Sequence, residues 1–428
     1  MKRKIGLLAL LVLVLLFVAG PAFSLDIEEE SSSTEELERK LDLLADEIDD
    51  LKSSGISAGT ANFNRVTVHG YGETHFNHNP RKNSTQVDQH RFVFGIHALL
   101  ADWIHLNAEI DFEHAAQKLE FEFGHVDFLL DPAFNIRAGV LLAPTGSLNE
   151  FHEPNLFWTV ERPLLQKQLI PTSWNSTGAG IYGNIMDGVN YRVYYMNSLQ
   201  SISRDSTKDG SGTGNGGSAS SFSSGGIRGG RGEANERIAD DFSIFARVEF
   251  TRLMRGLQVG FSIVDGDTTH NIIEEGGHMT LLEADLKYRW RWFDMNASVV
   301  NTEVDDSAAM NTFCASAAGA GCTVSSTSGI AANNFGYNVQ VGVHLPQLIG
   351  WRTTHDIVPH FMFERVRTQD EMEGGTAPDR SKNRNGIYTF GIAYLPIPEV
   401  SIKMDHTHTK LEDKTTEDQF NLGIAYMF

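Results

Sequence analysis

Ionisable side chains recur at every second position in several segments, where they could form one charged, water-facing surface. Basic residues on such a surface attract anions and phosphates, and carboxylates beside them oppose that attraction. The basic members of the set are Arg91, Arg137, Arg192, Arg247, Lys287, Arg289 and Lys403. The acidic members are Glu109, Asp111, Glu113, Glu120, Glu122, Glu249, Glu283, Asp285 and Asp405. This mixture of signs predicts weak selectivity for any solute path that these residues line.

Motifs for catalysis, cofactor binding or metal binding are missing from the sequence. The barrel segment 62–428 contains no GxSxG of a serine hydrolase, and neither CxxC nor HExxH occurs in the chain. The Gly- and Ser-rich stretch 197–239 lacks the GxxxxGK[ST] pattern of a phosphate-binding loop, so we interpret it as a mobile external loop. A formal net charge of −20 argues against nucleic acid as a partner. We therefore predict no catalytic residue, no cofactor and no metal.

The charged surface must be carried by extended strands, because from Arg65 onward apolar and polar residues alternate with a period of two. The clearest case is the segment 104–113, in which Ile104, Leu106, Ala108, Ile110 and Phe112 alternate with polar and acidic residues. Similar alternation is found at 92–100, 134–142, 242–250, 282–289 and 335–345. Near Gly124 the apolar parity changes, which predicts a β-bulge. A soluble sandwich would also alternate, with its polar face outside.

The connections between these segments favour a membrane barrel over a sandwich. Short turns alternate with long loops, as they do in transmembrane barrels, and the runs number about sixteen. The short turns are expected near 101–102, 131–132, 187–188, 255–256, 291, 346–354 and 396–398. The long connections are expected at 75–89, 143–177, 197–239, 265–277, 303–333, 368–385 and 410–417. Four of the six tryptophans, Trp103, Trp290, Trp292 and Trp351, lie at the short turns, as expected for an interfacial aromatic girdle. The predicted fold is all-β, a transmembrane antiparallel barrel.

The N-terminal residues have a different organisation. Three basic residues, an apolar run from Leu7 to Val18 and small residues near position 24 are typical of a signal peptide, predicted over 1–24. An acidic segment, 25–52, has leucine and isoleucine at heptad spacing and predicts a short coiled-coil stalk, with one amphipathic helix as the alternative. Residues 53–61 form a linker, and the barrel occupies 62–428. Because the exported chain meets an oxidising compartment, we expect Cys314 and Cys322 to form a disulfide.

The C-terminus provides the most specific signal. Phe420, Leu422, Ile424, Tyr426 and Phe428 place apolar side chains on one face up to a terminal Phe. In this the chain resembles bacterial outer-membrane porins, in which the final strand is read by the barrel assembly machinery; Tyr426 and Phe428 would form that signal. It looks most like the phosphate-selective porin O and P superfamily, through the pieces EFHEP, VERP and IPTSW within 140–183. The resemblance implies an outer-membrane location, contact with lipid and lipopolysaccharide, a periplasmic stalk and a homotrimer.

Because the connection 143–177 follows the fifth predicted strand, it is the third loop on the rim of long loops, and its composition is that of a loop that packs against a wall. Phe151, Leu156, Phe157, Trp158 and several leucines would have no role in a loop that is surrounded by solvent. The resemblance to porins implies that this loop folds inward and narrows the channel, and packing at a trimer interface is the alternative. The expected constriction residues are Glu150, His152, Glu153, Glu161, Arg162 and Lys167.

The predicted function is therefore passive diffusion of ions and small hydrophilic solutes, with anions such as phosphate among them, through a water-filled barrel. Such a protein is not an enzyme. Two alternatives stay open: a barrel enzyme with a catalytic site at the rim, and a barrel that forms a sheath for a partner protein. The resemblance to the phosphate-selective superfamily implies a ladder of arginines and other basic residues along the channel. Here that ladder is incomplete, because carboxylates share the face that carries the basic residues.

Overall fold

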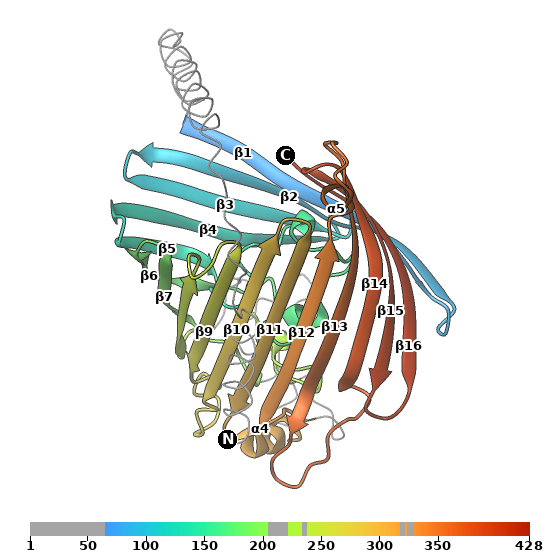
Figure 1. Ribbon diagram of the computed structural model, residues 1–428. Helices are drawn as coiled ribbons and strands as arrows, with labels where there is room; N and C mark the ends of the chain where they lie inside the picture. Colours follow the sequence, from blue (N-terminus) through green and yellow to red (C-terminus); the bar gives the residue numbers. More distant parts are fainter. Residues whose placement is uncertain (1–64, 204–220, 233–237, 317–321, 323–328) are drawn as a thin grey trace. The chain divides into compact units, whose positions relative to one another are not determined.

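The computed structural model describes residues 65–203, 221–232, 238–316, 322 and 329–428. Within this part of the chain, sixteen strands form a closed barrel in which each strand pairs with its neighbours in sequence and β1 pairs antiparallel with β16 (Figure 1). The predicted antiparallel barrel and its strand number are confirmed. The predicted signal peptide, coiled-coil stalk and linker lie outside the described residues.

The strands are β1 (Val66–Asn79), β2 (Ser84–Ala101), β3 (Ile104–Glu113), β4 (Lys118–Asp131), β5 (Phe134–Leu142), β6 (Asn175–Met186), β7 (Val189–Asn197), β8 (Phe242–Phe250), β9 (Leu257–Gly266), β10 (Met279–Trp290), β11 (Phe293–Val304), β12 (Asn333–Val343), β13 (Asp356–Glu371), β14 (Arg384–Ile397), β15 (Val400–Leu411) and β16 (Thr416–Met427).

The two faces of the barrel are inverted relative to a soluble β-protein. On β3 the carboxylates of Glu109 and Asp111 are buried, whereas Ile110 between them is 37% exposed. On β8 Arg247 is 2% exposed, whereas Ile244 is 49% exposed. Because successive side chains of a strand point to opposite faces, the alternation seen in the sequence becomes a charged inner wall and an apolar outer wall.

The short connections lie where the sequence predicts them, but two long connections are much shorter than expected. Residues 75–89, predicted to be a loop, mostly extend β1 and β2, which are joined by the turn 80–83. Likewise β15 and β16 continue to within four residues of each other. These strand ends carry polar residues on both faces, so they have no apolar period. They are paired by contacts such as Thr74 Oγ1 donating to Gln89 Oε1 at 2.6 Å and His408 Nδ1 contacting Asp418 Oδ1 at 2.7 Å.

The predicted bulge in β4 is confirmed close to its expected position. Glu109 pairs with Phe123 and Ile110 with Phe121, so that Glu122 is the extra residue. This irregularity keeps Glu122 buried on the inner wall while the following residues change parity. The four predicted girdle tryptophans are exposed at the rim that carries the short connections; they are Trp103, Trp290, Trp292 and Trp351.

Helical segments occur in the connections. They are η2 (Pro154–Leu156), α3 (Leu164–Gln168), η3 (Arg228–Gly230), α4 (Ser307–Cys314) and α5 (Leu345–Ile349). No helix among the described residues has the length and apolar character needed to cross a membrane. The connection 346–354, predicted to be a short turn, contains most of α5, which is followed by the C-cap residue Gly350 with a φ of +69°.

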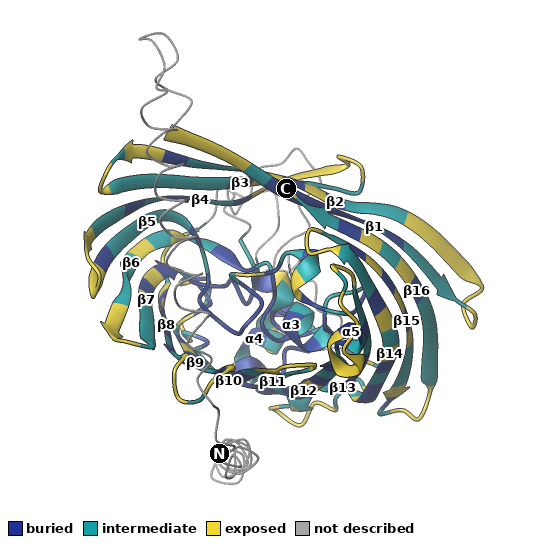
Figure 2. Ribbon diagram, turned by 45° about the horizontal axis from the view of Figure 1, so that its top comes forward, coloured by how far each residue is buried: buried dark blue, intermediate teal, exposed yellow. Residues whose placement is uncertain are grey.

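The interior of the barrel also contains an apolar cluster. Leu165, Leu169 and Trp174 from the connection after β5 pack with Phe222 and Ile227 from the connection after β7, and all five are almost fully buried. Side chains of the inner wall complete this cluster; they include Leu141, Tyr194, Phe245, Leu281, Val300 and Val366. Loop segments therefore fill part of the barrel, as Figure 2 shows for the buried segments inside the ring of strands.

Candidate functional site

The connection 143–174 enters the barrel and returns to its starting point. The Asn149 side chain closes its base, because Nδ2 donates to the carbonyl oxygens of Ala143 and Trp174 at 2.8 and 2.9 Å and Oδ1 accepts from the Trp174 amide at 2.7 Å. We call residues 143–174 the inner loop. Its ends are thus held together by the loop itself, independently of the strands.

Charged residues of the wall hold the middle of the inner loop. Lys403 Nζ on β15 donates to three backbone carbonyls, those of Pro154, Phe157 and Thr159, at 2.5, 2.7 and 3.1 Å. Nearby, Asp405 Oδ2 accepts from the Val160 amide at 2.6 Å. Hydrogen bonds that involve a charged group are roughly twice as strong as neutral ones. These wall charges therefore hold the loop in place.

Helix α3 of the inner loop is seated on β12 and β13. Glu364 on β13 accepts from the amides of Leu164 and Leu165 at 3.1 and 2.9 Å, which satisfies two free amides in the first turn of the helix. Leu165 and Leu169 pack onto Gly336, where an added Cβ would lie 2.6 and 2.7 Å from their methyl groups. A larger residue at Gly336 would displace the helix.

His152 joins the inner loop to β1 and β4. Its Nδ1 donates to the Asn149 carbonyl at 2.9 Å, and its Nε2 lies 2.9 Å from Glu122 Oε1 and 2.9 Å from the Tyr71 hydroxyl. With hydrogen bonds to a carbonyl and a carboxylate, both ring nitrogens carry protons. Burial by itself would lower the pKa of His152, but the charge and hydrogen bond of Glu122 outweigh burial and raise it to about 9.

Replacing His152 by Gln should lower stability in a pH-dependent way. The pKa of His152 is higher in the folded protein than in the unfolded chain, so its contribution is complete below about pH 6.5 and disappears as the pH rises through about 9. A shift of this size corresponds to about 3 kcal/mol. The measurement is the difference in unfolding free energy between the wild type and His152→Gln in detergent from pH 5 to 10, with His355→Gln as the exposed control. A difference that does not change with pH would contradict this assignment.

Two cavities flank the inner loop, and both are lined by Glu161, Arg162 and Lys167. The first has a volume of about 150 Å³ and also touches β1 and β2, whereas the second, of about 340 Å³, lies against β13 to β16. Burial would raise the pKa of Glu161, but the hydrogen bond and charge of His75, together with Lys167 and Asn77, lower it to about 2. Glu161 is therefore an anion at neutral pH, close to two cationic side chains.

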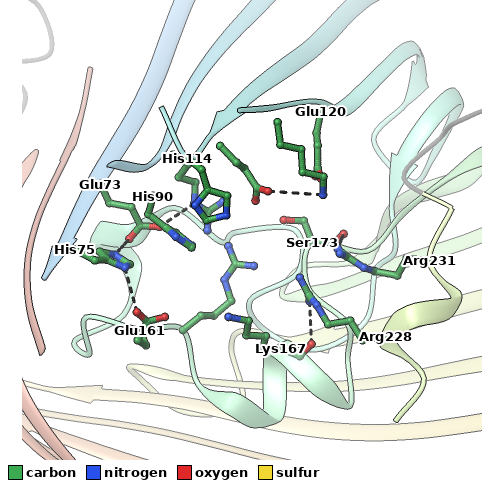
Figure 3. Close-up of a pocket in the computed structure, with 14 residues that line it drawn as sticks. Glu73, His75, His90, His114, Glu120, Glu161, Lys167, Ser173, Arg228 and Arg231 are labelled. Atoms are coloured by element: carbon green, nitrogen blue, oxygen red, sulfur yellow. Dashed lines mark hydrogen bonds and ion pairs between the residues drawn. The ribbon is translucent and has the colours of Figure 1, made fainter. Parts of the chain in front are cut away.

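The strand side of the first cavity carries carboxylates and histidines together with Arg91 and Lys118, whereas its loop side is mainly cationic (Figure 3). Glu73, His75, His90 and His114 lie on one side, and Lys167, Arg228 and Arg231 lie across from them. Arg228 Nη1 donates to the carbonyls of Lys167 and Thr172 at 2.9 and 2.5 Å, and Arg231 Nη1 donates to the Ser173 carbonyl at 2.6 Å. These hydrogen bonds to backbone carbonyls hold the two guanidinium groups in place, and their positive charges face the cavity.

The six predicted constriction residues do not lie together. Glu161, Arg162 and Lys167 line the open space, whereas His152 is buried against the wall. Glu150 lies 3.3 Å from Arg192 on β7, and burial raises the pKa of its carboxyl. Glu153 has one carboxylate oxygen that is buried. Glu150 and His152 therefore join the loop to the wall instead of lining the open space.

The predicted lining residues point inward but are largely paired with one another. Arg91 lies 2.8 Å from Glu73 and 4.0 Å from Asp111, and Arg137 lies 2.6 Å from Asp127. Arg247 contacts Glu249, Glu283 and Asp285. Arg192 contacts Glu249, and Glu109 contacts His69. Lys287 donates to the Ser147 carbonyl. Arg289 is exposed at the rim near Asp294.

The interpretation of 197–239 as a mobile external loop is wrong for its described part. Phe222 and Ile227 are buried in the apolar cluster, and Thr368 Oγ1 on β13 donates to the Ser224 carbonyl at 2.7 Å. Two isolated apolar residues and two arginines within a Gly-rich stretch were the available signal. Sequence reasoning also missed His75, which lies in the segment 75–89 that was predicted to be a loop, and Glu73, which precedes that segment.

Two further predicted features have a clear position. Cys314 and Cys322 are bonded through their sulfur atoms, with a Cα–Cα distance of 5.5 Å. Phe428 continues the pairing of β16 with β1, because its amide donates to the Gly70 carbonyl at 2.9 Å and its carbonyl accepts from the Gly70 amide at 3.0 Å. The Phe428 ring is 58% exposed.

Comparison with solved structures identifies the architecture. The barrel aligns with OmpF of Salmonella typhi in complex with daunomycin, with a TM-score of 0.53 and 9% identity over 85% of this chain and 97% of that one. It aligns with the anion-selective porin of Comamonas acidovorans, with a TM-score of 0.51 and 10% identity over 85% of this chain and 99% of that one. The chain has the porin fold. The outer membrane channel DcaP of Acinetobacter baumannii gives a TM-score of 0.50 at 10% identity, over 85% of this chain and 97% of that one.

Sequence comparison adds a relative but no family. A protein of Aquifex aeolicus strain VF5, described only as uncharacterized, is 28% identical over 371 residues, which cover 85% of this chain and 80% of that protein. No protein-family profile matches the chain. The three solved structures are similar in fold at 9 to 10% identity, so the similarity concerns the barrel and not a particular solute.

Proposed function

We propose that this protein is a porin of the bacterial outer membrane, through which ions and small hydrophilic solutes diffuse passively. The observation that carries the proposal is the inverted barrel, in which Glu109, Asp111 and Arg247 are buried inside while apolar residues cover the outside. An apolar outer band suits lipid, and a polar interior suits water. The charged interior is therefore the solute path.

The inner loop forms the constriction in this proposal. It contacts strands on several sides of the barrel, through Tyr71 on β1, Glu364 on β13 and Lys403 on β15. The two cavities beside it share Glu161, Arg162 and Lys167, so a solute that passes the loop meets a carboxylate and two cations at close range. The unlike charges across the first cavity would orient water and polar solutes.

The surroundings of the barrel follow from the same proposal. The outer wall contacts lipid and lipopolysaccharide, the segment 25–52 extends into the periplasm, and the final strand with Tyr426 and Phe428 is recognised by the barrel assembly machinery. A homotrimer is supported by the heptad spacing in that segment and by the resemblance to porins. Transport of phosphate belongs to this proposal as one of the anions admitted.

Planar lipid bilayers provide the decisive experiment. Purified full-length protein should insert in uniform, stepwise increments of ion conductance. A heat-denatured sample of the same preparation is the control. An electrically closed barrel would refute the channel, and hydrolytic activity in such a barrel would favour the enzyme alternative. A closed barrel without activity that copurifies with a second protein inside it would favour a sheath.

The selectivity of the channel should be weak. Most lumenal cations are paired with carboxylates, as Arg91, Arg137 and Arg247 are, so their fields largely cancel beyond the pair. The measurement is the reversal potential in a potassium chloride gradient, which should stay close to zero. Strong anion selectivity, with block of the chloride current by phosphate, would instead indicate a specific anion channel.

A further inference from the structure

Three side chains whose metal-ligating atoms converge lie at the edge of the first cavity, and two of them, His90 and His114, line it. Asp88 and His90 lie on β2, and His114 directly follows β3. Asp88 Oδ2 is 3.1 Å from His90 Nδ1 and 2.8 Å from His114 Nδ1. The ligand atoms of these residues all lie within 4.8 Å of one another, an arrangement found once among the described residues.

These distances match the ligand spacing of a transition-metal centre. Zn²⁺ binds imidazole nitrogen and carboxylate oxygen at about 2.0–2.2 Å, which places tetrahedral ligands roughly 3.3 Å apart. The two separations from Asp88 Oδ2, 3.1 and 2.8 Å, need to open by only a few tenths of an ångström. Two imidazoles and one carboxylate leave at least one coordination position open, which is the pattern of an accessible zinc site and not of a closed structural one.

The surrounding structure holds the two imidazoles in place. The His75 ring stacks on His90 with centroids 4.7 Å apart and planes 14° apart. His75 is itself fixed by Glu73 and Glu161, at 2.9 and 3.2 Å. The backbone of the turn after β3 is joined to β2, because the amides of His114 and Ala115 donate to the carbonyls of His90 and Gln89. The ligands therefore project from a paired part of the sheet.

Other histidines of the barrel contact two carboxylates without forming such a centre. His278 meets Asp267 through Nδ1 and Asp265 through Nε2, and His344 meets Asp356 and Asp294 in the same divided way. Opposite ring nitrogens point in different directions, so these carboxylates cannot share one ion with the ring. At Asp88, by contrast, both rings direct Nδ1 toward the same oxygen.

We propose that Asp88, His90 and His114 bind one divalent transition-metal ion, with Zn²⁺ as the reference ion. The ion is held on the cavity wall by two Nδ1 atoms and Asp88 Oδ2. Water or a passing solute occupies its remaining positions. Since imidazole ligands favour Zn²⁺, Ni²⁺ and Cu²⁺ over Mg²⁺ and Ca²⁺, the site discriminates between these groups of cations. The side chains are 18 to 44% exposed, so the ion can enter from the cavity.

Metal binding can be tested in detergent without measuring transport. Full-length protein without a polyhistidine tag is stripped with a chelator and titrated with ZnCl₂ by calorimetry, and with CoCl₂ by visible absorbance. We expect one Zn²⁺ per chain and a Co²⁺ spectrum with nitrogen ligands. The variants His114→Gln and Asp88→Asn should each weaken binding by about tenfold or more, which is at least the cost of losing a partner outside the coordination sphere.

The variant His278→Gln is the matched control, because it also removes an imidazole that contacts two aspartates and should bind Zn²⁺ as the wild type does. Circular dichroism shows whether each variant remains a folded barrel. The absence of saturable Zn²⁺ binding to folded wild type would refute the site. So would undiminished binding by the double variant His90→Gln/His114→Gln, or Mg²⁺ binding as tight as that of Zn²⁺. None of these outcomes depends on whether the barrel conducts ions.

Discussion

Replacing residues 150–172 of the inner loop by a short Gly-Ser linker is expected to raise the single-channel conductance several-fold. Asn149, Ser173 and Trp174 remain, and their hydrogen bonds already bring the ends of the deleted segment together. The deletion removes the backbone that Lys403 and Glu364 hold inside the barrel. These wall side chains then face water, so they are not left buried without partners. Single-channel recordings in symmetric potassium chloride provide the measurement.

The control for this deletion is a change in a loop that does not enter the barrel. Residues 374–377, between β13 and β14, are exposed, and replacing them by a Gly-Ser segment of equal length should leave the conductance unchanged. If the deletion of 150–172 has no effect while the variant still inserts as a folded barrel, the narrow point lies elsewhere. The connections after β7 and β11 would then be the next segments to shorten.

Replacing Arg247 by Ala is expected to destabilise the barrel by about 3–5 kcal/mol, the usual cost of removing one partner from a buried ionic cluster. The guanidinium lies 2.9 Å from Glu249, 3.3 Å from Glu283 and 2.7 Å from Asp285. Without it, three carboxylates would repel one another at a site that is almost fully buried. Unfolding by urea in detergent micelles, followed by tryptophan fluorescence, measures the loss.

Two further variants isolate the ionic cause. Arg289→Ala removes a guanidinium that is 58% exposed and 4.0 Å from Asp294, and the unfolding free energy should change by no more than about 1 kcal/mol, as for a surface pair. Adding Glu283→Gln and Asp285→Asn to Arg247→Ala removes two of the repelling charges and should recover part of the stability. If Arg247→Ala lowers the unfolding free energy no more than Arg289→Ala does, water and not the guanidinium compensates the charge of these carboxylates.

The strands and the orientation of their faces could be predicted from the sequence because both depend on local alternation. Ile110 is exposed and Asp111 is buried for the reason that the sequence already shows: adjacent residues of a strand point to opposite sides. Prediction failed at strand ends where polar residues occupy both faces, because no alternation of apolar and polar residues marks the strand there. The polar ends of β1 and β2 were therefore predicted to be a loop, and His75 was missed with them.

The amino-acid sequence alone determined the strands and which side of each strand carries the polar residues, since both follow from patterns within a few residues. The barrel was predicted from the alternation of short and long connections, and the inward course of the connection after β5 was implied by the resemblance to porins. Only the tertiary structure decided which charges remain open to solute. It assigned Lys403, Glu364 and His152 to holding the inner loop, and brought Arg228 and Arg231 to the cavity. It also placed His114 beside Asp88, 26 residues away. These contacts join residues distant along the chain, and their distances depend on barrel register and loop path, which no local pattern specifies.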